Sequence, residues 1–227
     1  MADLLREFCA ENLTHVEKAI EAGARRIELC DNLAVGGTTP SHGVVRAAVE
    51  LCHSRDAAVM CMVRPRGGDF EYAPWEARVM EDDLHHAAKL GVDGVVLGCL
   101  RDGHLDRELT SRLVGLAKDE GLAVTFHMAF DSLPATERLD TIDYLARIGV
   151  ERILTHGGAA GTPIEDNFDV LRGYVEHAVG RITILPGGGI TYANAQVVAA
   201  ALGVAEVHGT RIVDLAAGRH AGTGVAN

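Results

Sequence analysis

The chain has 227 residues, of which 48% are hydrophobic and 23% are charged, and its net charge at pH 7 is −11. This length suits one large core, and we expect a single domain over 1–227. The acidic balance argues against nucleic-acid and anionic-membrane partners, and no apolar stretch is long enough to span a membrane. Five cysteines without a CxxC pair and no secretory pattern predict a reduced protein of the cytoplasm.

One pattern recurs along the chain: an Ala-rich amphipathic segment, then a glycine, then a short apolar strand. It occurs at 21–30, 89–98, 119–127, 147–155, 177–185 and 201–209. We expect the glycine of each repeat to end a helix in the left-handed conformation. These glycines are Gly23, Gly91, Gly121, Gly149, Gly180 and Gly203. Two further strands near 4–9 and 58–63 complete a set of eight.

Eight strands that alternate with helices in a chain of this length predict a single (β/α)₈ TIM barrel. An open doubly wound sheet is the alternative. It is disfavoured because the segment after the first strand, "FCAENLTHVEKAI", lacks a glycine-rich loop. We expect 212–227 to be an irregular tail.

In a TIM barrel, functional side chains gather at the C-terminal ends of the strands. Glu28 and His127 lie there and are candidates for general acid–base catalysis, together with Asp69. The stretch "VRPRGGDF" places Arg64 and Arg66 directly after a strand. These arginines could clamp a phosphate or carboxylate, or form a structural ion pair with Glu28 or Asp69.

Glycines follow the seventh predicted strand in "ILPGGGIT", and "VHGT" ends the eighth. Backbone N–H groups in such a segment can bind an anion, although glycines also simply permit a tight turn. The candidate residues for binding an anion or substrate, besides the two arginines, are Thr155, Gly187, Gly188, Gly189, His208 and Gly209.

Cys9 and Cys30 end the first two strands in the matched settings "EFC" and "ELC". Adjacent strands lie about 4.8 Å apart, so two thiolates there could share one soft metal ion. Met60 and Met62 on the third strand are soft donors nearby. The alternative is that both cysteines are small buried hydrophobic residues.

Some chemistries are excluded by what the chain lacks. The only lysines, Lys18, Lys89 and Lys118, fall on helical segments, which excludes an aldolase with a Schiff-base lysine on a strand. No dinucleotide or P-loop fingerprint is present, so we expect no nucleotide cofactor.

The sequence resembles the CutC family of copper homeostasis proteins. The resemblance runs through "RIELCDNLAVGGTTPSHGVV", "MVRPRGGDFEY", "AVTFHMAFD", "RILTHGG", "ILPGGGIT" and "EVHGT", in the family's order. It implies a cytoplasmic, dimeric TIM barrel linked to copper tolerance, with Cu(I) bound at Cys9 and Cys30. The chain departs from the family pattern at Val35, Met128 and His156, and in its short C-terminus.

Two functions are consistent with these residues. The first is copper homeostasis with Cu(I) as the bound ion. The alternative is a lysine-independent lyase or epimerase that acts on a small phosphorylated or carboxylated substrate. In that enzyme Glu28 or His127 would be the acid or base, and Arg64 and Arg66 would bind the anionic group.

Overall fold

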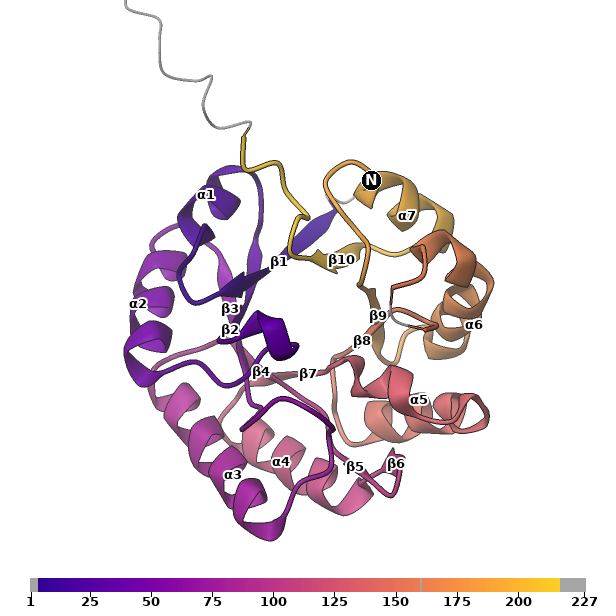
Figure 1. Ribbon diagram of the computed structural model, residues 1–227, viewed down its shortest axis with the longest axis horizontal. Coiled ribbons are helices and arrows are strands. Elements are labelled where there is room, and N and C mark those ends of the chain that lie inside the picture. The colour runs from indigo at the N-terminus through magenta and orange to yellow at the C-terminus, as the bar shows by residue number, and fades with distance from the viewer. Residues whose placement is uncertain (1–3, 160, 217–227) are drawn as a thin grey trace, which may run out of the picture.

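The computed structural model describes residues 4–159 and 161–216. Its main sheet has eight strands in the order β10-β1-β2-β3-β4-β7-β8-β9, and every neighbouring pair is parallel. The strands are β1 (Leu5–Glu11), β2 (Arg26–Cys30), β3 (Ala58–Met62), β4 (Gly94–Leu97), β7 (Ala123–Phe126), β8 (Arg152–Thr155), β9 (Thr183–Pro186) and β10 (Glu206–Gly209). The sheet curls into a nearly closed ring (Figure 1). The predicted TIM barrel is therefore confirmed, and the open sheet is not formed.

Helices surround the ring and cover its outer face (Figure 1). They are α1 (Val16–Glu21), α2 (His42–His53), α3 (Pro74–Lys89), α4 (Arg107–Asp119), α5 (Arg138–Arg147), α6 (Phe168–Ala178) and α7 (Ala195–Leu202). The glycines predicted to end helices all have φ between +68° and +103°. An L-residue with a side chain is strained in this conformation, so these glycines set where each helix stops.

A hairpin after β4 was not predicted from the sequence. A small antiparallel hairpin, β5 (Leu100–Arg101) and β6 (His104–Leu105), follows β4. Its turn is Asp102-Gly103, both with positive φ, and an Asp-Gly pair is a strong sequence signal for a two-residue hairpin turn.

The predicted irregular tail begins after β10. Residues 212–216 form only bends and turns, and the rest of the tail, 217–227, lies outside the described residues. Among the described residues, which end at 216, no helix follows β10. Over the described ranges, no helix combines the length and hydrophobicity needed to cross a membrane.

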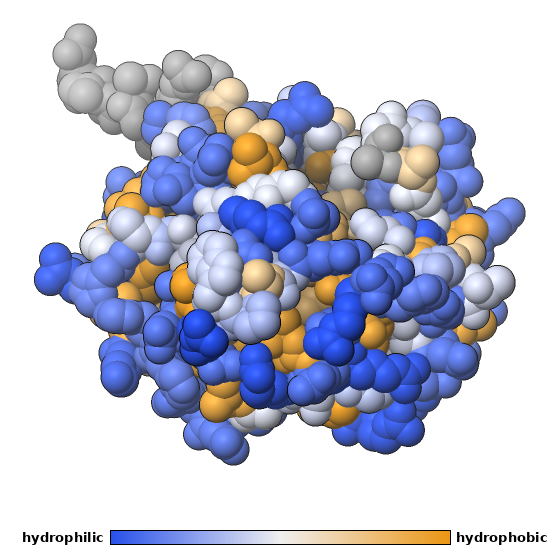
Figure 2. All heavy atoms as spheres, turned by 60° about the horizontal axis from the view of Figure 1, so that its bottom comes forward, coloured by the Kyte–Doolittle hydropathy of each residue, from blue (hydrophilic) through white to orange (hydrophobic). Residues whose placement is uncertain are grey.

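Side chains along each strand point alternately outward, to the helices, and inward, to the centre of the barrel. The protein therefore has two separate buried regions. Phe8, Ile27 and Leu29 point outward and belong to the large apolar core beneath the helices, whereas Cys9 and Glu28 do not. On the face shown in Figure 2, most of the surface is hydrophilic and hydrophobic residues form scattered patches. The barrel interior beside β10, β1 and β2 differs from that of most TIM barrels. Buried charged groups occupy it instead of the usual branched apolar residues.

Candidate functional site

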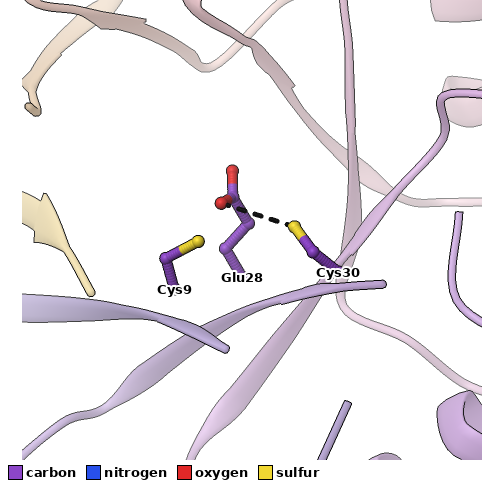
Figure 3. A group of neighbouring side chains, drawn as sticks. All are labelled: Cys9, Glu28 and Cys30. Atoms are coloured by element: carbon purple, nitrogen blue, oxygen red, sulfur yellow. Dashed lines mark hydrogen bonds between the residues drawn. The ribbon is translucent and has the colours of Figure 1, made fainter. Parts of the chain in front are cut away.

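The register of β1 and β2 brings two thiols and a carboxylate together. Cys9 lies opposite Glu28, and Cys30 follows two residues later on the same face of β2. One ligand atom from each of these three buried side chains lies within 4.8 Å of the others. In Figure 3 the Glu28 carboxylate stands between the two sulfur atoms. The predicted proximity of Cys9 and Cys30 is thus present in the structure.

Both thiols are held in their protonated form. The Cys30 thiol donates to Glu28 Oε2 at 3.7 Å. Contact with Cys9 lowers the pKa of Cys30, but burial and the Glu28 carboxylate outweigh this and raise it to about 11. Cys30, burial and Glu28 raise the pKa of Cys9 well above its ordinary value. A metal ion that binds here must therefore displace protons from sulfur.

His208 from β10 is wedged between two acids. Its Nδ1 lies 2.8 Å from Glu7 Oε1, and its Nε2 lies 3.6 Å from Glu28 Oε2. Burial alone would lower the pKa of His208, but Glu28, Cys9 and Glu7 raise it well above its ordinary value. The acids around His208 therefore favour its protonated, cationic form.

An ion-pair network continues below this histidine. Arg26 pairs with Glu7 and reaches Glu206 at 2.6 Å. Burial would raise the pKa of Glu7, but His208 and Arg26 lower it to about 2. Burial raises the pKa of Glu28, whose Oε1 has no hydrogen-bond partner among the described residues. Glu7 and Arg26 were not predicted as part of the site; Glu7 begins the "EFC" setting, but only the register of β1 and β2 places Arg26 opposite it.

Soft side chains surround the thiols. Cys9, Cys30, Met60, Met62 and Val96 form one buried cluster inside the barrel. A Cβ at Gly37 would lie 3.0 Å from Cys30 Sγ and 3.6 Å from Met62 Cε, so the loop backbone passes closely over both. Met60 instead accepts a contact from Arg152 at 3.7 Å. Of the two methionines, Met62 is the one that lies under the Gly37 backbone together with Cys30.

A cavity of about 250 Å³ opens at the barrel mouth. Its lining comprises Cys9, Glu28, Leu33, Gly36, Met62, Phe70, His127, Met128, Leu154, His208 and Thr210. The short helical turn η1 (Leu33–Val35), drawn in purple near the centre of Figure 1, contributes to this lining. The candidates Glu28, His127 and His208 therefore share one cavity with Cys9.

Arg64 is buried, and its guanidinium contacts neither Glu28 nor Asp69, the two acids that the ion-pair interpretation offered to Arg64 or Arg66. Its guanidinium donates to the carbonyls of Val35 and Gly37 at 2.9 Å and of Gly68 at 2.8 Å. It also lies 4.8 Å from the ring centre of Phe70. Backbone carbonyls have taken the place of the expected carboxylate because two loops fold over this strand end. Arg64 thus ties these loops together beside the cavity.

Arg66 lies at the surface. It pairs with Asp69 at 3.0 Å, as one of the predicted pairings stated, and with Glu76 at 2.6 Å. Asp69 is exposed, and neither residue is among the described residues that line the cavity. Their proposed roles in anion binding and catalysis therefore have no support from position.

The loops after β8, β9 and β10 pack tightly against one another. Gly187 N–H donates to the Thr155 carbonyl at 3.0 Å, and a Cβ at Gly209 would lie 2.5 Å from the Ile190 carbonyl oxygen. Gly188 and Gly189 both have φ of +79°. This geometry accounts for the glycines as packing requirements, and their role in anion binding stays a prediction.

Asp131 occupies the position near Thr155 where an anion was expected. Its carboxylate accepts hydrogen bonds from the Thr155 hydroxyl, from His156 N–H at 2.8 Å and from Gly157 N–H at 3.3 Å. This acid was not predicted as a site residue, since one aspartate in "HMAFD" carries no local signal of a role. Thr155 therefore binds an internal carboxylate.

Comparison with known proteins places these features in a family context. The CutC family model matches residues 4–213. A CutC family protein of Enterococcus faecalis is 54% identical over 211 residues, which cover 92% of this chain and 100% of that protein. The mouse copper homeostasis protein cutC homolog is 40% identical over 205 residues, or 90% of this chain and 72% of that protein. A crystal structure of a CutC protein from Streptococcus agalactiae has a TM-score of 0.89 and 45% identity, and covers 92% of this chain and 100% of that one.

Proposed function

This chain belongs to the CutC family of copper homeostasis proteins, and from that premise we propose that it binds Cu(I) through the thiolates of Cys9 and Cys30. The observation that carries the proposal is the buried group of Cys9, Glu28 and Cys30, with ligand atoms within 4.8 Å of one another. Thiolates are the ligands that Cu(I) prefers, and copper is here the cargo of the protein.

The charges around the thiols support a cationic metal with two thiolate ligands. Two thiolates and one Cu(I) carry a net charge of −1, which a low-dielectric interior tolerates only beside a compensating cation. His208 places positive charge beside this group, because it lies 3.6 Å from Glu28 and the surrounding acids, Glu7 among them, favour its protonated form. Met62, in the same buried cluster, can offer a third soft donor.

A cytoplasmic location and a homodimer complete the proposal. All five cysteines are unpaired thiols, as a reducing compartment requires. The homodimer rests on the family resemblance of the sequence. Sedimentation of the pure protein tests it, since a monomer at micromolar concentration would contradict it.

The test of copper binding is an anaerobic titration of Cu(I) against a chromogenic Cu(I) chelator. We expect one Cu(I) per wild-type chain and loss of this binding in the double variant Cys9→Ala, Cys30→Ala. Cys52→Ala is the matched control, because it also removes a buried thiol, from α2 rather than from the site. Unchanged binding by the double variant would place copper elsewhere and overturn the proposal.

A further inference from the structure

Sulfur-containing side chains line the cavity at the barrel mouth and differ in how far they are buried. Met128, Met62 and Cys9 all belong to the cavity wall. Met128 is half-buried, whereas Cys9 exposes 7% of its surface and Met62 exposes 3%. Cys30 is fully buried and is not among the described residues that line the cavity. The sulfur donors are therefore graded in exposure, with Met128 the most exposed and Cys30 the least.

The loop that follows β7 places Met128 at the rim of this cavity. Met128 begins the short helical turn η2 (Met128–Ser132) at the C-terminal end of the strand. Its side chain extends toward the loop after β9, because a Cβ at Gly188 would lie 3.5 Å from Met128 Cε. Met128 therefore reaches from one loop of the barrel mouth to another, on the wall of the cavity that Cys9 also lines.

A copper ion that enters this cavity must give up its ligands from solution on the way to the thiols. A bare cation among apolar side chains is strongly unfavourable. Leu33, Phe70 and Leu154 in the cavity wall offer the ion no ligand atom. A thioether is a neutral, soft donor with no proton to lose, and it suits Cu(I). The Met128 sulfur can therefore bind the ion at the rim while the remaining solution ligands leave.

We propose that Met128 is an entry ligand, whose sulfur binds Cu(I) at the rim of the cavity and passes the ion to Cys9 and Cys30. The inference rests on the proposed copper binding and adds the route by which the ion reaches the thiols. The bond from copper to Met128 forms as a solution ligand leaves. It breaks as the bonds to the two cysteine sulfurs form and their protons pass to solvent, and copper stays Cu(I) throughout. Because an entry ligand lowers the barrier in both directions, Met128 speeds association and dissociation alike.

Met62 provides a contrast because it lies deeper in the same cavity. It belongs to the buried cluster of Cys9 and Cys30, and it lies with Cys30 under the Gly37 backbone. A donor at that depth belongs to the final site, so its loss should speed dissociation more than it slows association. The two methionines of the cavity wall are therefore expected to have different kinetic effects.

The test measures both rate constants of Cu(I) exchange with the full chain under anaerobic conditions. Stopped-flow mixing with the acetonitrile complex of Cu(I) gives association from the ultraviolet absorption of the copper–thiolate bonds, and excess chromogenic chelator gives dissociation. In Met128→Leu we expect both rate constants to fall about tenfold or more. Leucine nearly keeps the volume of methionine, so the variant should fold. The matched control is Met80→Leu, which should change neither rate because Met80 is fully buried in the core beneath the helices.

Two kinetic results would overturn the entry role. Equal rate constants in the wild type and in a folded Met128→Leu variant would show that Met128 only packs at the rim. Faster dissociation with unchanged association would make Met128 a ligand of the final site. Absence of Cu(I) binding by the wild-type chain contradicts the proposed function itself, and the equilibrium titration shows this before any rate is measured.

Discussion

The two ends of the barrel interior use buried polar groups in opposite ways. At the N-terminal end Arg26 pairs with Glu7 and Glu206. At the C-terminal end Glu28 Oε1 and His127 Nε2 have no partner among the described residues, and two protonated thiols lie beside them. Buried charges that are paired stabilise the fold, whereas an unpaired buried polar group lowers the free energy of unfolding. We therefore interpret the first end as structural, and the second end contains the residues of the proposed copper site.

His208 connects the two ends. One ring nitrogen contacts Glu7 of the paired network and the other faces Glu28 of the mouth. A change in charge at the barrel mouth therefore acts on His208, whose position is fixed by its contact with Glu7.

The largest effect is expected from breaking the paired end. Glu7→Ala leaves Arg26 and His208 without their shared partner, and removing one member of a buried ion pair costs about 3–5 kcal/mol of unfolding free energy. Glu28→Gln, at the unpaired end, should cost no more than about 1 kcal/mol, because one of its two oxygens has no bond to lose. Urea denaturation measures both. Equal losses would contradict the distinction between the two ends.

The Glu7 effect has a defined pH dependence. The folded-state pKa of Glu7, about 2, lies below its ordinary value of 4.5. Its contribution to stability is therefore complete above the ordinary value and disappears as the pH falls toward the folded value. The stability gap between wild type and Glu7→Ala should shrink over that acid range. A gap that stays constant would show that Glu7 acts through packing rather than charge.

Copper affinity should depend steeply on pH. Both thiols have raised pKa values, that of Cys30 being about 11, so each Cu(I) that binds releases up to two protons near neutrality. The apparent affinity should then rise by up to about 100-fold per pH unit. Competition with a calibrated chelator between about pH 6 and about pH 8 measures the slope. A flat profile would mean that thiolates do not hold the metal.

A smaller contrast separates the two arginines of "VRPRGGDF". Arg64→Met leaves three loop carbonyls without their donor and should cost about 2 kcal/mol. Arg66 is partly exposed and makes surface ion pairs, so Arg66→Met should cost less than about 1 kcal/mol. Thermal unfolding of both variants provides the comparison. A larger loss from Arg66→Met would reverse the assignment of the buried and exposed positions.

The barrel could be predicted well from the sequence, because the glycines that end its helices and the apolar residues of its strands are local signals. The positions of Cys9 and Cys30 also followed from the strand ends. The partners of Arg64 could not be predicted, since backbone carbonyls of distant loops leave no mark in residue identity. The network of Arg26, Glu7 and Glu206 was missed for a related reason. It joins residues far apart in the chain, and only strand register brings them together.

The proposed copper site is tested most directly by the identity of the atoms that surround the metal. X-ray absorption spectroscopy at the copper edge of the Cu(I)-loaded protein reports these atoms. We predict a first shell dominated by sulfur, and loss of that shell in the Cys9→Ser, Cys30→Ser variant. A first shell of nitrogen and oxygen alone, or a sulfur shell unchanged in that variant, would contradict copper binding by the two thiolates.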